Sequence, residues 1–210
     1  MNKRLDTILS FIKLEDRVID IGTDHAYIPI KLAKMGCKNI IASDVNDNVL
    51  KISKNNILNE HVEDKITLIK SNGLLEIDTR DFDTVIIAGM GYMTIKSILS
   101  NTDKLINISK IIIQSNNEIY KMRKYMYDIG YHLEDEKTLC IKNHFYVLME
   151  FVKGNEVLTD EMMYLGIVKD DKKDYYQSLK NYYEDIKCKA TDDERIKFIN
   201  NYLNIIEKVI

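Results

Sequence analysis

The stretch that decides the fold is Val18-Ile19-Asp20-Ile21-Gly22-Thr23-Asp24-His25-Ala26-Tyr27-Ile28-Pro29. An apolar run ends in Asp20-Ile21-Gly22, polar residues follow, and a helical pattern begins near Pro29. This order predicts a strand, a tight turn and a helix N-terminus within a dozen residues. Such a junction offers backbone N–H groups and the positive end of a helix dipole to a polar ligand, and Gly22 has no Cβ to keep that ligand away.

The strand-to-helix pattern recurs along the next hundred residues. Strands are expected at 17–21, 39–43, 66–69, 84–88 and 110–114. Helices are expected near the N-terminus, from Pro29 to Gly36, from a cap at Asp47, over 93–99, and from Asn116 to Gly130. Five such β/α alternations predict an α/β fold, a Rossmann-like doubly wound sheet with ligands at the carboxyl ends of its strands.

The remaining third of the chain has a different pattern. Segments 131–140 and 145–151 are rich in β-forming residues and predict an antiparallel hairpin at the sheet edge. Two heptad-spaced sets of apolar residues follow: Tyr175, Leu179, Tyr182 and Ile186, then Ile196, Ile199, Leu203, Ile206 and Ile210. With a capping box at Thr191–Glu194 between them, these predict a C-terminal α-helical hairpin, an antiparallel coiled coil. We therefore expect domains at 1–153 and 154–210.

Composition limits the class of protein. The 210 residues are 45% hydrophobic, enough for a sizeable core, and no apolar run is long enough to span a membrane. The three cysteines are widely spaced without nearby histidines, which favours structural thiols in a reducing cytoplasm over disulfides or a metal site. A net charge of −3 argues against a strongly cationic nucleic-acid binder, so any RNA must be held by local patches.

Polar or glycine residues follow each expected strand, and Asp44 ends the second one. Together with the Asp-x-Gly turn, this looks like the cofactor loop of an S-adenosylmethionine (SAM) methyltransferase. The N–H groups of Gly22, Thr23 and Asp24 would hold the methionine portion of SAM, with Asp20 near its ammonium group. Asp44 would accept from the ribose hydroxyls, and Asn72 and Gly73 would meet the adenine. The remaining expected cofactor contacts are Val45, Ala88 and Gly89. The structural alternatives are helix caps at Asp20 and Asp44 and a plain turn at Asn72-Gly73.

Three motifs in order, Asp20–Pro29, Ile87-Ala88-Gly89-Met90-Gly91 and Gln114-Ser115-Asn116, resemble the bacterial tRNA (adenine-22, N1)-methyltransferase family. The resemblance implies a class I methyltransferase fold, SAM as methyl donor, and N1 of an adenine in the D-arm region of tRNA as acceptor. Four residues depart from the family pattern: Asp44, Asn72, Tyr92 and Ser115. None of these departures removes the core motifs.

The acceptor side is expected to follow directly after the cofactor loop. We predict Asp24, His25 and Tyr27 as catalytic residues, with Tyr27 stacking on the flipped base, Asp24 stabilising positive charge and His25 hydrogen-bonding beside it. Substrate contacts are expected from Met90, Gly91 and Asn116. The structural alternatives are a core tyrosine at 27, a structural partner at His25 and a helix cap at Asn116.

The sequence leaves two other functions open: a SAM-dependent methyltransferase of another substrate, or a non-catalytic RNA- or nucleotide-binding module. The basic and aromatic segment 120–127 has two interpretations as well, an RNA-facing helix or a helix whose Met122 and Met126 line the core. We expect tRNA as partner, no metal, no membrane, and a monomer or weak homodimer.

Overall fold

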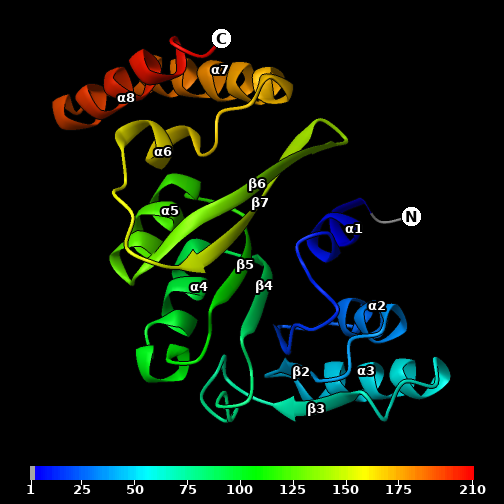
Figure 1. Ribbon diagram of the computed structural model, residues 1–210. Helices are drawn as coiled ribbons and strands as arrows, with labels where there is room; N and C mark the ends of the chain where they lie inside the picture. Colours follow the sequence, from blue (N-terminus) through cyan, green and yellow to red (C-terminus); the bar gives the residue numbers. More distant parts are fainter. Residues whose placement is uncertain (1–2) are drawn as a thin grey trace.

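Seven strands form one mixed sheet in the order β3-β2-β1-β4-β5-β7-β6 in the computed structural model, which describes residues 3–210 (Figure 1). The strands are β1 Val18–Ile21, β2 Ile40–Asp44, β3 Ile66–Lys70, β4 Thr84–Met90, β5 Lys110–Ser115, β6 Tyr131–Ile141 and β7 His144–Lys153. Strands β1 to β5 are parallel, whereas β7 runs antiparallel to β5 and β6 antiparallel to β7. The predicted doubly wound sheet with a hairpin at its edge is confirmed.

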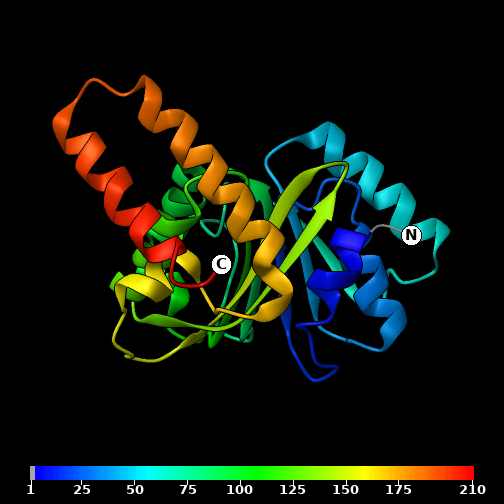
Figure 2. The same ribbon diagram turned by 90° about the horizontal axis from the view of Figure 1, so that it is seen from above.

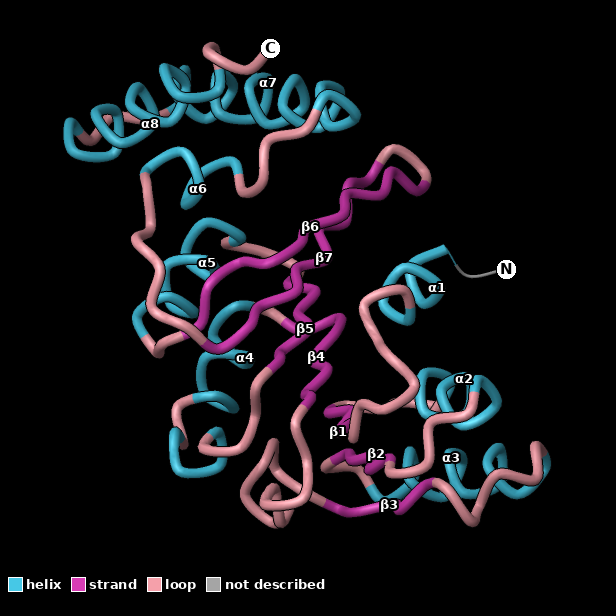
Figure 3. Tube along the Cα trace, in the orientation of Figure 1, coloured by secondary structure: helices cyan, strands magenta, loops and turns pink. Residues whose placement is uncertain are grey.

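Helices cover both faces of the sheet, with α1, α2 and α3 on one side and α4 and α5 on the other (Figure 3). The helices are α1 Lys3–Leu9, α2 Tyr27–Met35, α3 Asp47–Asn59, α4 Tyr92–Leu99, α5 Ile119–Asp128, α6 Asp160–Leu165, α7 Lys173–Lys189 and α8 Asp193–Ile206, with short 3-10 turns at Thr102–Leu105 and Asp170–Lys172. Because both faces are covered, the central strands are apolar at successive positions. Ile111 and Ile113 pack toward α4 and α5, while Ile112 between them packs toward α1 and α2.

The predicted starts of α2, α3, α4, α5 and α8 are wrong by one to three residues. Helix α2 begins at Tyr27 rather than Pro29, because the chain turns into the helix through Ala26 in a left-handed conformation (φ 58°). Asn46, not Asp47, caps α3 by accepting from the N–H of Asn48. The cap of α8 is Asp192, one residue after the predicted Thr191. Turn residues close to a helix compete for the capping position, and sequence pattern alone does not separate them.

The C-terminal helices α7 and α8 lie side by side at one end of the molecule, as two views show (Figures 1 and 2). Ile199, Leu203 and Ile206 are buried as expected, but Tyr182 and Ile210 are exposed. The place expected for Tyr182 is taken by its neighbour Tyr183, which packs edge-on against Tyr202 with ring centroids 4.2 Å apart. That the pair winds as a coiled coil, and that a domain boundary falls at 153, stay predictions.

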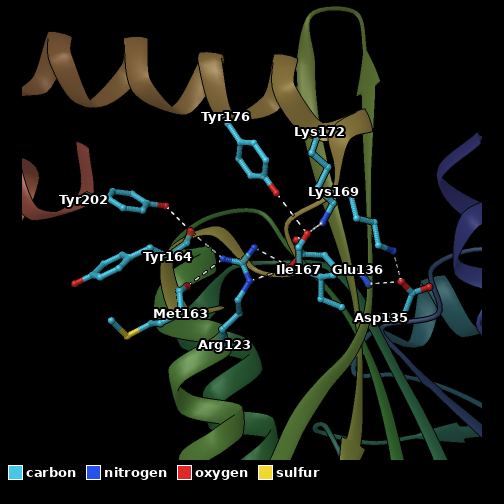
Figure 4. A network of polar contacts seen from close by, with 10 residues as sticks. All are labelled: Arg123, Asp135, Glu136, Met163, Tyr164, Ile167, Lys169, Lys172, Tyr176 and Tyr202. Atoms are coloured by element: carbon cyan, nitrogen blue, oxygen red, sulfur yellow. Dashed lines mark hydrogen bonds and ion pairs between the residues drawn. The ribbon is translucent and has the colours of Figure 1, made fainter. Parts of the chain in front are cut away.

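A short helix that was not predicted, α6, connects the sheet to α7, and buried charges lie beneath it (Figure 4). Arg123 on α5 lies 2.8 Å from the Glu136 carboxylate on β6, and Lys172 lies 2.8 Å from its other oxygen. All three side chains are buried. Arg123 also donates to the carbonyls of Met163 and Tyr164. An RNA-facing role for Arg123 is therefore wrong, while the core positions of Met122 and Met126 on the same helix are confirmed.

Among residues 3–210, no helix combines the length and the apolarity that crossing a lipid bilayer requires.

Candidate active site

The polar turns predicted from sequence all follow strands that are neighbours in the sheet. The chain leaves β1 toward β2 and β3, then returns to β4 and β5 on the other side, so the winding direction reverses between β1 and β4. Doubly wound sheets bind ligands in the crevice at such a reversal. The side chain of Met90 on β4 lies directly against Gly22, where an added Cβ would be 2.2 Å from the Met90 Cε atom. The loops after β1 and β4 therefore meet at this crevice.

Asp20 carries the most perturbed charge at this crevice. Its side chain is 3% exposed, and one carboxylate oxygen has no hydrogen-bond partner within residues 3–210. Burial, together with the nearby Asp44 carboxylate, raises the pKa of Asp20 to about 7. The Thr23 hydroxyl partly opposes this shift, although no hydrogen bond of good geometry joins the two side chains. A buried, unpartnered carboxylate is costly in isolation and favours a cationic ligand.

The loop from Gly22 to Ala26 is strained. Gly22, Asp24 and Ala26 all have positive φ, at 70°, 53° and 58°. Only the first is a glycine, so the other two carry a steric cost of about 1–3 kcal/mol each. Two α3 side chains that the sequence did not single out hold this conformation: the buried Ser53 hydroxyl donates to the Asp24 carbonyl, and the Asn56 amide donates to the His25 carbonyl at 3.0 Å.

The strained loop turns two aromatic rings outward. The His25 and Tyr27 rings stack with centroids 5.5 Å apart and planes 11° apart. His25 Nε2 also lies 3.6 Å from an exposed oxygen of Asp24. Tyr27 is 53% exposed, so the alternative of a core tyrosine is wrong. The three predicted catalytic side chains thus lie together on one accessible surface next to the cofactor loop.

The turn after β2 holds Asp44 in place. One Asp44 oxygen accepts from the N–H of Asn46 at 2.9 Å, and the side chain is partly exposed beside the loop. Asp44 does not cap α3, because Asn46 does. Val45 is exposed next to it. The carbonyl of Ser43, one residue earlier, accepts from the N–H groups of both Gly22 and Thr23, so the β1 and β2 turns are joined through the main chain. The prediction that these two N–H groups donate to the methionine portion of SAM is therefore wrong.

The turn after β3 is shaped by Glu76, a residue that the sequence pattern gave no reason to choose. Its carboxylate accepts from the Asn72 N–H at 2.8 Å and from the Ser71 hydroxyl at 2.9 Å. These bonds lower the pKa of Glu76. They leave the Asn72 side chain exposed, and Gly73 has a φ of 63°. Glu76 thus closes a turn rather than capping a helix, and its spacing from Ser71 and Asn72 matches no capping motif that the sequence would have revealed.

The loops after β4 and β5 are tied by two neighbouring asparagines. The Asn116 amide donates to the Gly89 carbonyl at 2.7 Å, and its main-chain N–H donates to the Met90 carbonyl at 2.9 Å. Asn116 does not cap α5, which begins after Glu118. Asn117 accepts from the N–H of Tyr92 at 2.8 Å and so caps α4 from another loop. Gly89 has a φ of 81° and open space where a Cβ would project.

Two departures from the family pattern fit this arrangement. Tyr92 lies at the first position of α4, where its N–H bonds to Asn117 and its ring lies 5.9 Å from the Lys96 ammonium. The family pattern that the sequence resembles has proline at the position of Ser115. The Ser115 hydroxyl donates to the Asn117 carbonyl at 2.8 Å, and proline has no side-chain donor that could make this bond. Both residues hold the loops together rather than block the crevice. Ala88 and Gly91 on the same loop are partly exposed.

The residues of this crevice fit SAM in charge. The buried Asp20 oxygen without a partner suits the ammonium group, and the partly exposed Asp44 suits the ribose hydroxyls. Gly89 exposes main chain to a ligand, whereas at Gly22 the Met90 side chain fills the space where a Cβ would project. Within residues 3–210, no group of three or more His, Cys, Asp and Glu side chains is arranged to hold a metal ion.

Comparison with known proteins identifies the fold. The family described as "Methyltransferase domain" matches residues 1–149, well over half of the chain. The chain belongs to this methyltransferase family. A curated tRNA (adenine(22)-N(1))-methyltransferase of Bacillus subtilis is 30% identical over 141 residues, which cover 66% of this chain and 59% of that protein. The resemblance found from the sequence motifs is confirmed.

Two solved structures match nearly the whole chain. TrmK of M. capricolum, in complex with the cofactor product S-adenosyl-homocysteine, is 27% identical with a TM-score of 0.86, covering 99% of this chain and 96% of that one. A Streptococcus pneumoniae protein in complex with S-adenosyl-L-methionine is also 27% identical, with a TM-score of 0.88 and coverage of 100% and 99%. The predicted fold, including the C-terminal helices, is therefore shared along the full length of these relatives.

Proposed function

We propose that this chain transfers a methyl group from SAM to N1 of an adenine in tRNA. The observation that carries the proposal is a buried carboxylate without a partner, Asp20, directly beside the exposed Asp24-His25-Tyr27 surface. One side of the loop suits a cationic donor and the other suits a planar acceptor. The named activity of the Bacillus subtilis relative and the ligands of the two structural relatives support the same donor and acceptor.

The reaction requires the methyl group of SAM and N1 of the adenine to be aligned, and it requires no proton to be removed from N1. Bound SAM supplies an electrophilic methyl group, and neutral adenine offers a lone pair on N1, so no general base is needed. The exposed Tyr27 ring, backed by His25, would stack on the flipped adenine and orient N1. The Asp24 carboxylate would stabilise the positive charge that develops on the ring. Main-chain groups of Met90 and Gly91, with Asn116 holding their loop, would contact the base edge.

The setting of the reaction follows from its substrate. We propose a cytoplasmic enzyme that works as a monomer or weak homodimer and needs no metal. SAM contacts are assigned to Asp20, Gly22, Thr23, Asp44, Val45, Asn72, Gly73, Ala88 and Gly89.

Incubation of the chain with SAM and total tRNA is expected to produce N1-methyladenine at a D-arm adenine. A methyl group on N1 blocks Watson–Crick pairing, so reverse transcription will stop at the modified nucleotide. Mapping these stops with and without SAM tests the proposal. SAM consumption with no stop in tRNA would favour a methyltransferase of another substrate. Failure to bind SAM would favour a non-catalytic nucleotide-binding module.

The variant Tyr27→Ala is expected to lower methyl transfer about a hundredfold, because a base that is not held in line loses much of its reactivity. SAM affinity should stay within about twofold, since Tyr27 is half-exposed, stacks on His25 and is not assigned to the cofactor. Single-turnover assays and calorimetry measure the two quantities. Tyr27→Phe keeps the ring and serves as the control, with turnover near that of the parent. Parental turnover in Tyr27→Ala would remove the residue from the mechanism.

A further inference from the structure

A cleft of about 660 Å³ opens between the loop after β5 and the C-terminal helices. It is bounded by the loop after β5, the turn between β6 and β7, and one side of α7 and α8. Gln114 and Asn116 belong to its wall, and Asn116 also fastens the Gly89 loop of the acceptor site. We call this space the α7–α8 cleft. The cleft shares Asn116 with the candidate active site, and its volume lies in the range of about 300–1,000 Å³ that is typical of small-molecule sites.

Aromatic side chains dominate the lining of the α7–α8 cleft. Tyr120 and Phe198 pack with ring centroids 5.3 Å apart, and Tyr183 packs against Tyr202 behind them. These rings are partly exposed or buried and form a fixed wall. Tyr182 on the same lining is 59% exposed, although it was expected in the apolar seam between the helices. An exposed ring beside a rigid aromatic wall is suited to hold a planar group by stacking.

Two cationic side chains, Lys121 and Arg195, line the cleft, and only Arg195 is without an ion-pair partner among residues 3–210. Lys121 is paired with Glu118 at 3.1 Å, so its charge is largely neutralised. Arg195 at the start of α8 lines the cleft and is exposed, and among residues 3–210 no carboxylate forms an ion pair with it. A guanidinium group suits a phosphate, and the rings suit a base. The chain as a whole is acidic, so stacking rather than overall charge must supply the affinity.

We propose that the α7–α8 cleft binds an unpaired nucleotide of the same RNA whose adenine occupies the active site. The inference rests on the proposed function. An adenine that leaves its stack also leaves a neighbour or a pairing partner exposed, at a cost of a few kcal/mol. A second aromatic site, which shares Asn116 with the active site, captures that nucleotide and holds the RNA open. The C-terminal helices thereby select RNA whose acceptor lies next to nucleotides that can unstack.

The test compares full-length variants in binding of fluorescently labelled tRNA, measured by anisotropy in the presence of S-adenosyl-homocysteine. Tyr182→Ala is expected to weaken tRNA binding about tenfold, in line with the loss of one stacked base. Tyr182→Phe keeps the ring and should bind like the parent. Arg195→Ala should weaken binding several-fold, whereas Lys197→Ala, which removes an exposed cation from the same helix outside the cleft, should have little effect. SAM affinity and melting temperature should stay the same in all four variants.

The readout separates this inference from the proposed function. Parental tRNA affinity in Tyr182→Ala and Arg195→Ala, while the parent methylates tRNA, overturns the cleft and leaves the proposed function standing. If these two variants keep parental tRNA affinity but no longer form a dimer that the parent forms in sedimentation, the occupant of the cleft is a second copy of the chain instead. If the parent binds tRNA without methylating N1, the proposed function fails but the binding comparison still decides on the cleft. A parent that does not bind tRNA overturns both.

Discussion

Glu136→Ala is expected to destabilise the protein by about 3–5 kcal/mol, the cost of removing one partner from a buried ion pair. The Glu136 carboxylate is the counter-charge of two buried cations, Arg123 and Lys172, with a shortest contact of 2.8 Å to each. Without it, two positive charges, one on α5 and one in the segment before α7, stay buried against β6. Urea unfolding followed by circular dichroism measures the loss.

A matched control lies two residues away on the same strand. Glu134 is exposed, so Glu134→Ala should cost less than about 1 kcal/mol. The loosening caused by Glu136→Ala should be confined to the segment around α6. Arg123 donates to the Met163 and Tyr164 carbonyls, and Lys172 donates to the Ile167 carbonyl, so displaced cations release this segment. Limited proteolysis is therefore expected to cleave first between residues 154 and 172. If Glu136→Ala is as stable as Glu134→Ala and shows no new cleavage, the buried contacts among Arg123, Glu136 and Lys172 do not hold α6 and α7 in place.

The sheet could be predicted from the sequence because its signals are local. Parallel strands covered on both faces are apolar at successive positions, as in Thr84–Ala88, and glycine after a helix marks its end, as at Gly36. The strand order in space, which puts β1 beside β4, could not be predicted in this way, because alternating strands and helices with right-handed crossovers are compatible with more than one doubly wound order.

The buried charges could not be predicted, because nothing local distinguishes Arg123 from its neighbours. Lys121, Arg123 and Lys124 occupy one short basic segment, and only packing against β6 and α6 decides that one of them is buried. The same holds for Ser53 and Asn56, which clasp the catalytic loop from a helix that begins more than twenty residues later in the chain. Tertiary partners of this kind carry no periodic or spacing signal.

Asp20, unlike Arg123, could be chosen from the sequence as a ligand-binding residue. The energetic cost of burying its carboxylate appears only in the structure. Its pKa is about 7 in the folded protein, against 3.8 for an ordinary aspartate. Between these pH values the folded chain keeps a proton that the unfolded chain releases. The contribution of Asp20 to stability is therefore greatest below about pH 4 and falls until about pH 7. The whole difference corresponds to about 4 kcal/mol.

Asp20→Asn is expected to be more stable than the parent at pH 8, by about 1–3 kcal/mol. The amide cannot ionise, so the variant does not lose the stability that the parent loses above pH 4. A buried amide with incomplete hydrogen bonds costs about 1–3 kcal/mol, which offsets part of this gain. That amide cost does not depend on pH. The stability difference between variant and parent should therefore grow by about 2–3 kcal/mol from pH 5 to pH 8, and urea unfolding at the two pH values isolates the titration.

The same substitution should weaken SAM binding more than tenfold at pH 8, because the ammonium group loses its buried counter-charge. For the parent, SAM affinity should fall as the pH drops below about 7 and Asp20 takes up its proton. Asp44→Asn is the control: its side chain is partly exposed and contributes less than burial to the raised pKa of Asp20, so it should weaken SAM binding while stabilising the free protein less than Asp20→Asn does. If Asp20→Asn binds SAM like the parent, or shows no pH-dependent gain in stability, the carboxylate is not the ammonium site. A gain in stability together with a loss of binding would mean that this chain keeps a destabilising buried charge because its ligand needs it.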